Sequence, residues 1–250
     1  MSLLDVCDVS RNFGGILAID HVSFGVEEGQ IVGLIGPNGA GKTTMFNLIT
    51  RLYRPHSGEI VFDGKSLLGA PPQDMVRRGI ARTFQNVELF ETMTVLENVL
   101  VGAEPRLRWF RESDNRRLAG DVLAYVGLTP LADRPASGLP FGTLKRIEIA
   151  RALAGRPKLL LLDEPAGGLS HEELEELAAF IRRLRVDYEL TVLLVEHHMN
   201  LVMGVSDTVH VLDFGKLIAS GPPSEVRANP AVIEAYLGKE ESAVGAAGAD

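Results

Sequence analysis

Residues 30–49, QIVGLIGPNGAGKTTMFNLI, contain the feature that most constrains the fold of this chain. The apolar run Ile31 to Ile35 is typical of a short buried strand, and Gly36 to Thr43 follows it with the pattern GxxxxGKT. An apolar helix face comes next, at Met45, Leu48, Ile49 and Leu52. Because strand, glycine loop and helix in this order are the setting in which such a loop binds phosphate, the segment predicts an α/β fold with a nucleotide site.

The chemistry of this loop follows from its backbone. Glycines let several N–H groups point at one anion, and the helix N-terminus adds partial positive charge. Lys42 is placed to reach the β- and γ-phosphates, and the Thr43 hydroxyl to hold Mg²⁺. The predicted ATP-binding residues of the loop are Gly36, Pro37, Asn38, Gly39, Ala40, Gly41, Lys42, Thr43 and Thr44.

A second apolar run ends in two carboxylates. Leu159 to Leu162 predicts another buried strand, and Asp163 and Glu164 follow it. Because ligands of open α/β sheets bind at the carboxyl ends of the strands, Asp163 is placed to hold Mg²⁺ and Glu164 to polarise an attacking water. The alternative is a strand end with two solvated acids, which the nearby phosphate loop makes less favourable.

Two further residues fall near the same edge of the predicted sheet. His197 ends a third strand pattern, LTVLLVEHH at 190–198, and could contact the γ-phosphate and help to orient the water. Gln85 follows another apparent strand, GIARTF, although a lone glutamine is more often a surface residue. Ser170 and Glu173, between the second and third strands, have capping-box spacing and predict a crossover helix.

The stretch LPFGTLKRIEIARAL, residues 139–153, joins a glycine-containing loop to an amphipathic helix pattern. Its apolar positions recur at helical spacing, at Leu144, Ile147, Ala150 and Leu153. The loop has no lysine to hold a phosphate and no carboxylate to act on one. Taken alone, it is either a plain turn or half of a binding site whose other half lies elsewhere.

Composition limits the class of protein. The chain has 250 residues, 46% of them hydrophobic, which suffices for one sizeable core and a smaller lobe. Its one cysteine, Cys7, excludes an internal disulfide and favours a reducing compartment. The apolar runs are too short to cross a bilayer, and we expect no signal peptide. A net charge of −8 disfavours nucleic acid as the main partner, and the small, polar tail 239–250 is expected to be disordered.

The order of these motifs, beginning with an aromatic residue at Phe13, resembles the ATP-binding cassette ATPases from about residue 4 to 238. The resemblance implies an α/β P-loop NTPase with a mostly parallel core sheet, an N-terminal antiparallel β region and an α-helical subdomain. Residues 1–85 and 159–238 would form the ATP-binding core, and 86–158 the helical signature subdomain. The cofactors implied are ATP and Mg²⁺.

The resemblance also implies roles for individual residues. Phe13 would contact ATP, and Thr43, Gln85 and Asp163 would hold the metal. The catalytic residues would be Glu164, His197 and Gln85. The family's signature loop, usually LSGGQ, corresponds to Leu139, Pro140, Phe141, Gly142 and Thr143, and in such ATPases this loop binds the γ-phosphate of ATP held by a second subunit.

Several residues depart from the family pattern, and of the signature loop only Leu139 and Gly142 fit it. Pro140 stands where a serine is usual, so that the loop lacks both a hydroxyl and a backbone donor there. Thr143 replaces glutamine, and Ser170 replaces aspartate. These departures concern the composite site between subunits and leave the residues that hold the chain's own ATP unchanged.

Within the family, three segments resemble the ATPase of hydrophobic amino acid importers, namely residues 79–102, 194–226 and 229–238. In the last of these, Asn229 is suited to cap a helix with Pro230 in its first position. Such importers combine two non-identical ATPases with two membrane permeases and an external substrate-binding protein. The resemblance therefore implies a peripheral location on the cytoplasmic face of the membrane, and no nucleic-acid partner.

Several alternatives share the same catalytic residues. An exporter motor for lipid or lipopolysaccharide and a soluble cassette for iron–sulfur assembly differ only in their partners, and a DNA-maintenance ATPase is disfavoured by charge. Leu89, Phe90, Met93 and Val95 either face the membrane subunits or pack the lobe's own core. The arginine-rich stretch 104–117 is either a solvated linker or a contact with anionic headgroups.

Overall fold

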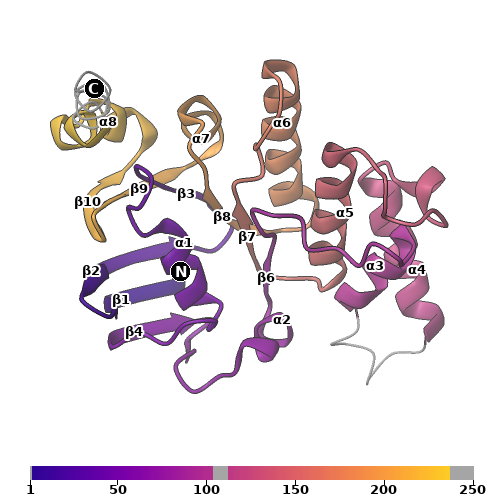
Figure 1. Ribbon diagram of the computed structural model, residues 1–250, viewed down its shortest axis with the longest axis horizontal. Coiled ribbons are helices and arrows are strands. Elements are labelled where there is room, and N and C mark those ends of the chain that lie inside the picture. Colours follow the sequence, from indigo (N-terminus) through magenta and orange to yellow (C-terminus); the bar gives the residue numbers. More distant parts are fainter. Residues whose placement is uncertain (1, 104–111, 237–250) are drawn as a thin grey trace, which may run out of the picture.

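Two β-sheets lie side by side in the structure, a computed structural model that describes residues 2–103 and 112–236 (Figure 1). The smaller sheet is antiparallel and has the order β2-β1-β4-β5. It consists of β1 (Ser2–Phe13), β2 (Ile16–Glu27), β4 (Ser57–Phe62) and β5 (Lys65–Ser66). This sheet is the antiparallel N-terminal region that the family resemblance implies.

The larger sheet has the order β10-β9-β3-β8-β7-β6. Its strands are β3 (Ile31–Ile35), β6 (Ile80–Arg82), β7 (Leu159–Asp163), β8 (Thr191–Val195), β9 (Thr208–Asp213) and β10 (Lys216–Gly221). Only the pair β9–β10 is antiparallel. Every residue of β3, β7 and β8 is buried, as expected where both faces of a parallel sheet are covered. The mostly parallel core sheet is thus confirmed.

Helices surround the larger sheet, and three of them form a separate group at one side (Figure 1). That group contains α3 (Val95–Ala103), α4 (Glu112–Tyr125) and α5 (Phe141–Ala154), all between β6 and β7 in sequence. The others are α1 (Lys42–Ile49), α2 (Met75–Arg78), α6 (His171–Asp187), α7 (Met199–Val205) and α8 (Pro223–Ala228). Two 3₁₀ helices, η1 (Pro72–Asp74) and η3 (Thr129–Leu131), are also present.

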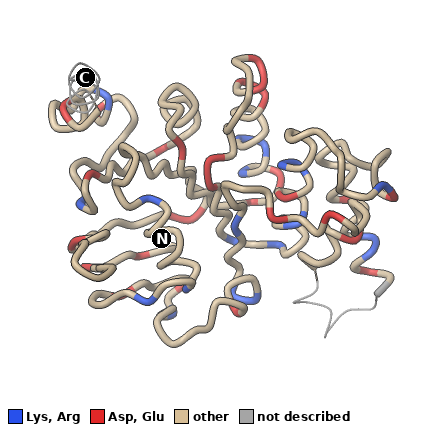
Figure 2. The backbone as a smooth tube through the Cα atoms, in the orientation of Figure 1, with Lys and Arg blue, Asp and Glu red and all other residues tan. Residues whose placement is uncertain are grey.

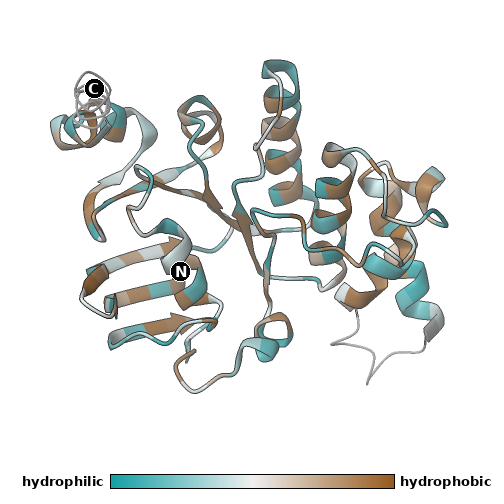
Figure 3. Cartoon of the chain, viewed as in Figure 1, coloured by the Kyte–Doolittle hydropathy of each residue, from teal (hydrophilic) through white to brown (hydrophobic). Residues whose placement is uncertain are grey.

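The apolar core alternates along the strands. Ile31, Ile35, Leu160 and Leu162 pack into the cluster shared with α3 to α7, whereas Val32, Leu34, Leu159 and Leu161 pack into the cluster shared with α1 and the antiparallel sheet. Successive side chains of a strand point to opposite faces, so each buried leucine run serves both clusters. Figure 3 shows the resulting hydrophobic band through the central strands.

The crossover helix α6 begins as predicted. Ser170 accepts the Glu173 backbone N–H, and the Glu173 carboxylate accepts the Ser170 backbone N–H, which completes the capping box. Figure 2 shows the acidic residues of α6 gathered toward one end and basic residues toward the other. Glu172 and Glu173 occupy its first turn and Arg185 its last turn, the arrangement that the helix dipole favours.

The helix α1 is shorter than the sequence predicts. It ends at Ile49, and Arg51 takes a left-handed backbone conformation with φ of 63°. Leu52 therefore lies beyond the helix with 51% of its surface exposed, and its prediction as part of the apolar helix face is wrong. Met45, Leu48 and Ile49 are fully buried, as predicted.

Of the four apolar residues noted after Gln85, two pack in the core and two are exposed. Val95 is fully buried and Leu89 packs against the same core, whereas Phe90 is 48% and Met93 36% exposed. Of the stretch 104–117, predicted to be a solvated linker or a headgroup contact, residues 104–111 lie outside the described residues and 112–117 belong to the helix α4. The tail 239–250, predicted to be disordered, also lies outside the described residues. No described helix combines the length and hydrophobicity needed to span a membrane.

The C-terminal helix cap is confirmed. Asn229 accepts the backbone N–H of Ala231 through its side chain at 2.9 Å, and residues 230–236 are helical. Val232 is buried in the core cluster on the α3 to α7 face, so this last helical segment is anchored to the body of the chain.

Candidate nucleotide-binding site

The phosphate loop connects β3 to α1 and depends on glycine at two positions. Gly36 and Gly41 have φ of 152° and 105°, which side-chain-bearing residues rarely adopt. A Cβ at Gly36 would lie 2.1 Å from the carbonyl oxygen of Leu212, and one at Gly41 2.7 Å from that of Ala18. The loop is therefore packed tightly against β9 and β2, and both glycines are required by the chain's own fold.

Lys42 stands at the N-terminus of α1, and its side chain folds back over the loop. Its Nζ donates to the carbonyl oxygens of Gly36 at 2.8 Å and Pro37 at 3.1 Å, and the residue is only 6% exposed. Helix α1 has no side-chain cap, so its first N–H groups are directed toward the same space. Ammonium and backbone donors together form a site for an anion.

The opposite wall is formed where β7 ends. Glu164 takes a left-handed backbone conformation with φ of 46°, and its Oε2 accepts a hydrogen bond from Gln85 Nε2 at 2.7 Å. Strained backbone in a non-glycine residue often occurs at functional sites. Gln85 comes from the loop after β6, so the predicted pair is brought together from segments 79 residues apart.

His197, which follows β8, forms a third wall of the site. The fully buried carboxylate of Glu196 accepts the backbone N–H groups of Ala166 at 2.6 Å and of His197 at 3.1 Å. Glu196 thereby ties the loop that follows β7 to the loop that follows β8. The His197 side chain is half exposed, and Glu196 orients the backbone that carries it.

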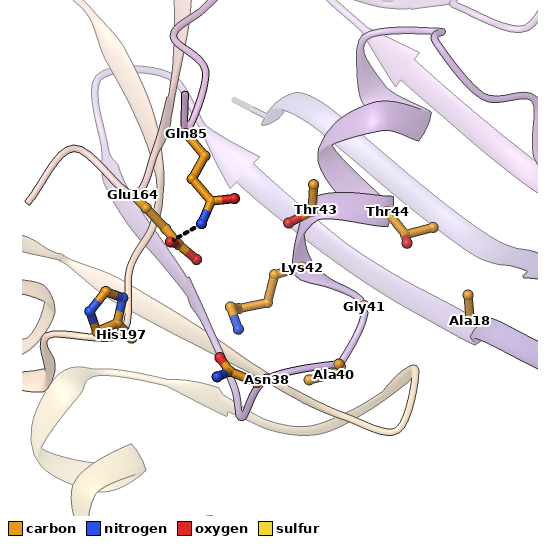
Figure 4. Close-up of a pocket in the computed structure, with 11 residues that line it drawn as sticks. Ala18, Asn38, Ala40, Gly41, Lys42, Thr43, Thr44, Gln85, Glu164 and His197 are labelled. Carbon is orange, nitrogen blue, oxygen red and sulfur yellow. Dashed lines mark hydrogen bonds between the residues drawn. The ribbon is translucent and has the colours of Figure 1, made fainter. Parts of the chain in front are cut away.

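These elements enclose one cavity of about 590 Å³. Figure 4 shows Lys42 and Glu164 directed into the same space, with His197 on the Glu164 side and Thr43 on the other. Its lining residues are Ala18, Asn38, Gly39, Ala40, Gly41, Lys42, Thr43, Thr44, Gln85, Glu164 and His197. The volume is in the range of small-molecule sites, and phosphate-binding and hydrolytic groups face each other across it.

Asp163 makes an ion pair that the sequence analysis missed. Its Oδ2 accepts from Arg82 Nη2 at 2.6 Å, and the two side chains are 2% and 6% exposed. Arg82 also donates to Asn47 Oδ1 at 2.7 Å, which ties β6 and β7 to α1. The available signal was an arginine inside a buried strand pattern, because a buried guanidinium requires a carboxylate partner.

Hydroxyl, amide and carboxylate oxygens are suited to Mg²⁺, and the chain offers all three. Thr43 and Gln85 line the cavity, and Asp163 adjoins Glu164, which also lines it. A carboxylate has two oxygens, so the Arg82 contact to Oδ2 leaves Asp163 with a second acceptor. The residues named from the sequence as metal ligands therefore fit such an ion in their chemistry.

The remaining predicted residues lie apart from this cavity, among the residues that the structure describes. Phe13 packs edge-on against Tyr53 with ring centroids 5.1 Å apart, and the Arg11 guanidinium lies 4.7 Å from its ring. The five residues from Leu139 to Thr143 occur at the start of α5, where Pro140 and Phe141 are exposed. The cavity within one chain therefore does not include the predicted signature loop.

Comparison with known proteins agrees with this geometry. Residues 19–167 match the sequence model of the ABC transporter family. Since that match spans more than half of the chain, the protein belongs to the ABC transporter family, in which such domains are ATP-binding cassettes. Residues 216–242 match a further model, described as a branched-chain amino acid ATP-binding cassette transporter.

Individual relatives agree with both matches. The chain is 44% identical to the high-affinity branched-chain amino acid transport ATP-binding protein BraF of Pseudomonas aeruginosa, over 95% of this chain and 98% of that protein. A crystal structure of an ABC transporter's ATP-binding cassette in its ADP conformation superposes with a TM-score of 0.86 at 32% identity, covering 95% of this chain and 99% of the other. A dimeric cassette in a post-hydrolysis state with ADP and phosphate gives 0.78 at 27% identity, covering 88% and 98%.

Proposed function

We propose that this chain is the ATP-hydrolysing subunit of an importer for branched-chain or other hydrophobic amino acids. The observation that carries the ATPase proposal is the single cavity in which Lys42, Gln85, Glu164 and His197 meet. The name of the similar Pseudomonas protein and the match of residues 216–242 support the cargo class.

In the proposed reaction, the loop N–H groups and the Lys42 ammonium hold the β- and γ-phosphates of ATP. Water attacks the γ-phosphorus, the bond from that phosphorus to the bridging oxygen of ADP breaks, and Glu164 accepts the proton of the water. Gln85, hydrogen-bonded to Glu164 at 2.7 Å, keeps the carboxylate directed into the cavity. His197, on the same side of the cavity as Glu164 (Figure 4), contacts the γ-phosphate.

Thr43, Gln85 and Asp163 would hold Mg²⁺ beside the phosphates. The ion would supply positive charge that offsets the charge of the phosphate oxygens. In the protein itself, Arg82 keeps Asp163 in place through the buried 2.6 Å ion pair, and Thr43 is presented by the first turn of α1.

The loop from Leu139 to Thr143 would act on ATP bound to a second cassette. Its residues Pro140 and Phe141 are exposed at the start of α5, and a similar solved cassette forms a dimer with ADP and phosphate. Phe13, exposed at the end of β1, would lie against the adenine. We further propose that the second cassette is a non-identical subunit, as the resemblance implies.

The membrane partners would contact the exposed side chains of the segment after Gln85. Phe90 and Met93 are exposed there, and Phe90 borders a depression of about 440 Å³ that is also lined by Leu89, Val101 and Gly102. The proposed complex contains two membrane permeases and an external substrate-binding protein. The chain would accordingly be a peripheral protein on the cytoplasmic face of the membrane.

The experiment that tests this function is affinity purification of the tagged Glu164→Gln chain from its own cells, in mild detergent with MgATP. We expect two multi-spanning membrane proteins and a second cassette in the purified complex. Recovery of soluble partners alone, with no membrane protein, would refute the transport function. Wild-type chain without nucleotide is the control, because it lacks the trapped ATP state.

A further inference from the structure

Three charged residues on one face of α5 are buried. Lys145, Glu148 and Arg151 follow at intervals of three, and their side chains are 8%, 0% and 16% exposed. Glu148 Oε2 lies 3.5 Å from Lys145 Nζ, and its Oε1 lies 3.9 Å from Arg151 Nη2. Burying charge is unfavourable unless the groups gain partners, so this row requires an explanation beyond helix packing.

The partners of this row are backbone atoms of the loop after β6. Lys145 Nζ donates to the carbonyl oxygens of Phe84 at 2.6 Å and Gln85 at 2.9 Å. Glu148 Oε1 accepts the backbone N–H of Phe84 at 2.8 Å, and Arg151 Nη1 donates to the carbonyl oxygen of Glu88. Because main-chain atoms are held, the path of residues 84–88 is fixed from α5 independently of the loop's own side chains.

The same loop is held from its other side by the end of β7. Gln85 reaches Glu164 through its side chain, at 2.7 Å, and Arg82, three residues earlier, pairs with Asp163. Figure 1 shows α5 standing between the central sheet and the pair α3 and α4. Residues 82–88 therefore form the connection between the hydrolytic carboxylates and α5.

The row also touches the start of its own helix. Lys145 Nζ lies 5.7 Å from the ring centroid of Phe141, within the range of a cation–π contact. Phe141 belongs to the loop from Leu139 to Thr143. One ammonium group thus contacts that loop and the backbone that carries Gln85.

We propose that Lys145, Glu148 and Arg151 are positioning residues that bind the backbone of residues 84–88 to α5, so that Gln85 and the loop at the start of α5 move as one body. The inference rests on the proposed hydrolytic role of Gln85 and Glu164. It links the two sites of the cassette: a shift of α5 toward the partner's ATP also changes how Gln85 meets Glu164 in the chain's own cavity.

Burial of Glu148 agrees with this role. Burial raises the pKa of its carboxyl group, while the Phe84 N–H, Lys145 and Arg151 act in the opposite direction. The contacts that hold the loop therefore offset part of the cost of burying this carboxyl group, and loss of one member weakens the others.

Hydrogen exchange of the nucleotide-free, full-length chain tests the structural part. In Lys145→Met, the Phe84 amide, which donates to Glu148, should exchange at least tenfold faster than in wild type, since the ammonium that holds Glu148 and the loop carbonyls is lost. Lys158→Met is the matched control, because that ammonium is half exposed and pairs with Asp63 at the surface. Unchanged exchange of the Phe84 amide in a folded Lys145→Met chain would overturn the proposal.

A second variant keeps the test possible if Lys145→Met does not fold. Arg151→Met removes only the outermost member of the row, at a side chain that is 16% exposed. If Lys145→Met does not fold, Arg151→Met should still raise exchange of the Phe84 amide several-fold, because Arg151 lies beside its acceptor Glu148. Protection equal to wild type in that variant would contradict the proposal.

A double-mutant cycle tests the link to catalysis. In the assembled complex, Lys145→Met should lower kcat on the order of tenfold with unchanged ATP affinity, and less than twofold further when Gln85→Ala is already present. Lys145→Arg should restore most of the rate. Equal, additive losses in both backgrounds would refute positioning through Gln85. If Glu164→Gln hydrolyses ATP normally, the proposed function fails, and the exchange result still decides whether α5 holds the loop.

Discussion

Two loops of this chain contain glycine and lead into a helix, yet their surroundings differ. The phosphate loop before α1 is packed so closely that a Cβ at Gly36 or Gly41 would overlap backbone atoms of β9 or β2. The predicted signature loop extends into the first turn of α5, where Gly142 lies, and a Cβ there would meet no atom within 4 Å apart from its chain neighbours and the helix's own backbone. Glycine is a requirement of the chain's own fold in the first loop and not in the second.

This difference indicates whether each loop binds a ligand of its own chain or a molecule from outside. The phosphate loop lines the cavity that also contains Glu164, so it serves a ligand of its own chain. The loop around Gly142 has room for a methyl group within its own chain. If glycine is needed there, the reason lies in a molecule that approaches from outside, as the proposed composite site requires.

The largest effect is expected from Glu164→Gln. Loss of the general base should reduce ATP hydrolysis by about 10²–10⁴-fold in the assembled complex, while ATP binding is retained. The measurement is phosphate release together with nucleotide affinity, and Glu176→Gln on the exposed side of α6 is the control. A rate within a few-fold of wild type would show that Glu164 is not the general base in the phosphate loop's cavity.

Lys42→Ala should affect binding rather than chemistry. Its ammonium is the charged group nearest to the loop carbonyls, and charge-assisted hydrogen bonds contribute roughly 1.5–3 kcal/mol each. We expect ATP affinity to fall by about 10²-fold in a nucleotide titration of the isolated chain. Lys216→Ala, at a side chain 66% exposed, should bind normally. Wild-type affinity in Lys42→Ala would contradict the role of this loop.

The two glycines provide the direct test of the comparison. Gly41→Ala forces a left-handed position and a 2.7 Å contact, so ATP affinity should fall by about 1–3 kcal/mol, roughly 5–150-fold. Gly142→Ala should leave the stability and ATP affinity of the isolated chain within about 0.5 kcal/mol of wild type, yet lower hydrolysis in the complex. Equal losses for both variants in the isolated chain would remove the distinction between the loops.

The smallest effect is expected from Pro140→Ser. Pro140 occupies the cap position of α5 and provides no side-chain hydrogen bond to the helix. Serine can accept a first-turn N–H, so the free energy of unfolding should rise by about 0.5–1 kcal/mol in a denaturant titration. ATP affinity of the isolated chain should stay unchanged. A drop in that affinity would mean that the two loops are not separate.

Much of the fold could be predicted because local pattern and tertiary structure agree. The run from Ile31 to Ile35 is a buried strand, and the Ser170 capping box starts α6 as its spacing indicates. The carboxylates after β7 were predictable because a leucine run can only be a buried strand at this length, and its end must lie at the sheet edge. The prediction that Leu52 belongs to the apolar face of α1 was wrong because apolar spacing cannot reveal the left-handed turn at Arg51.

What could not be predicted depends on contacts between distant segments. Lys145 and Glu148 look like an ordinary i,i+3 surface pair in the sequence, yet both are buried against the loop after β6. Arg82 meets Asp163 across 81 residues, and no spacing rule relates them. Phe13, at the end of β1, likewise meets Tyr53 in the loop between α1 and β4, and no motif relates the two residues.

The strand that supports the phosphate loop lies between two strands that come much later in the chain. β3 pairs with β8 and β9, and the Ile31 N–H bonds to the Asp207 carboxylate, 176 residues away. A ribosome adding about 5–20 residues per second needs roughly 9–35 s to synthesise that interval. Until β8 begins at Thr191, 160 residues after Ile31, β3 has no partner in the larger sheet. The segment that is translated early and binds ATP is thus among the last to be completed, so a nascent chain cannot bind nucleotide until it is almost fully synthesised.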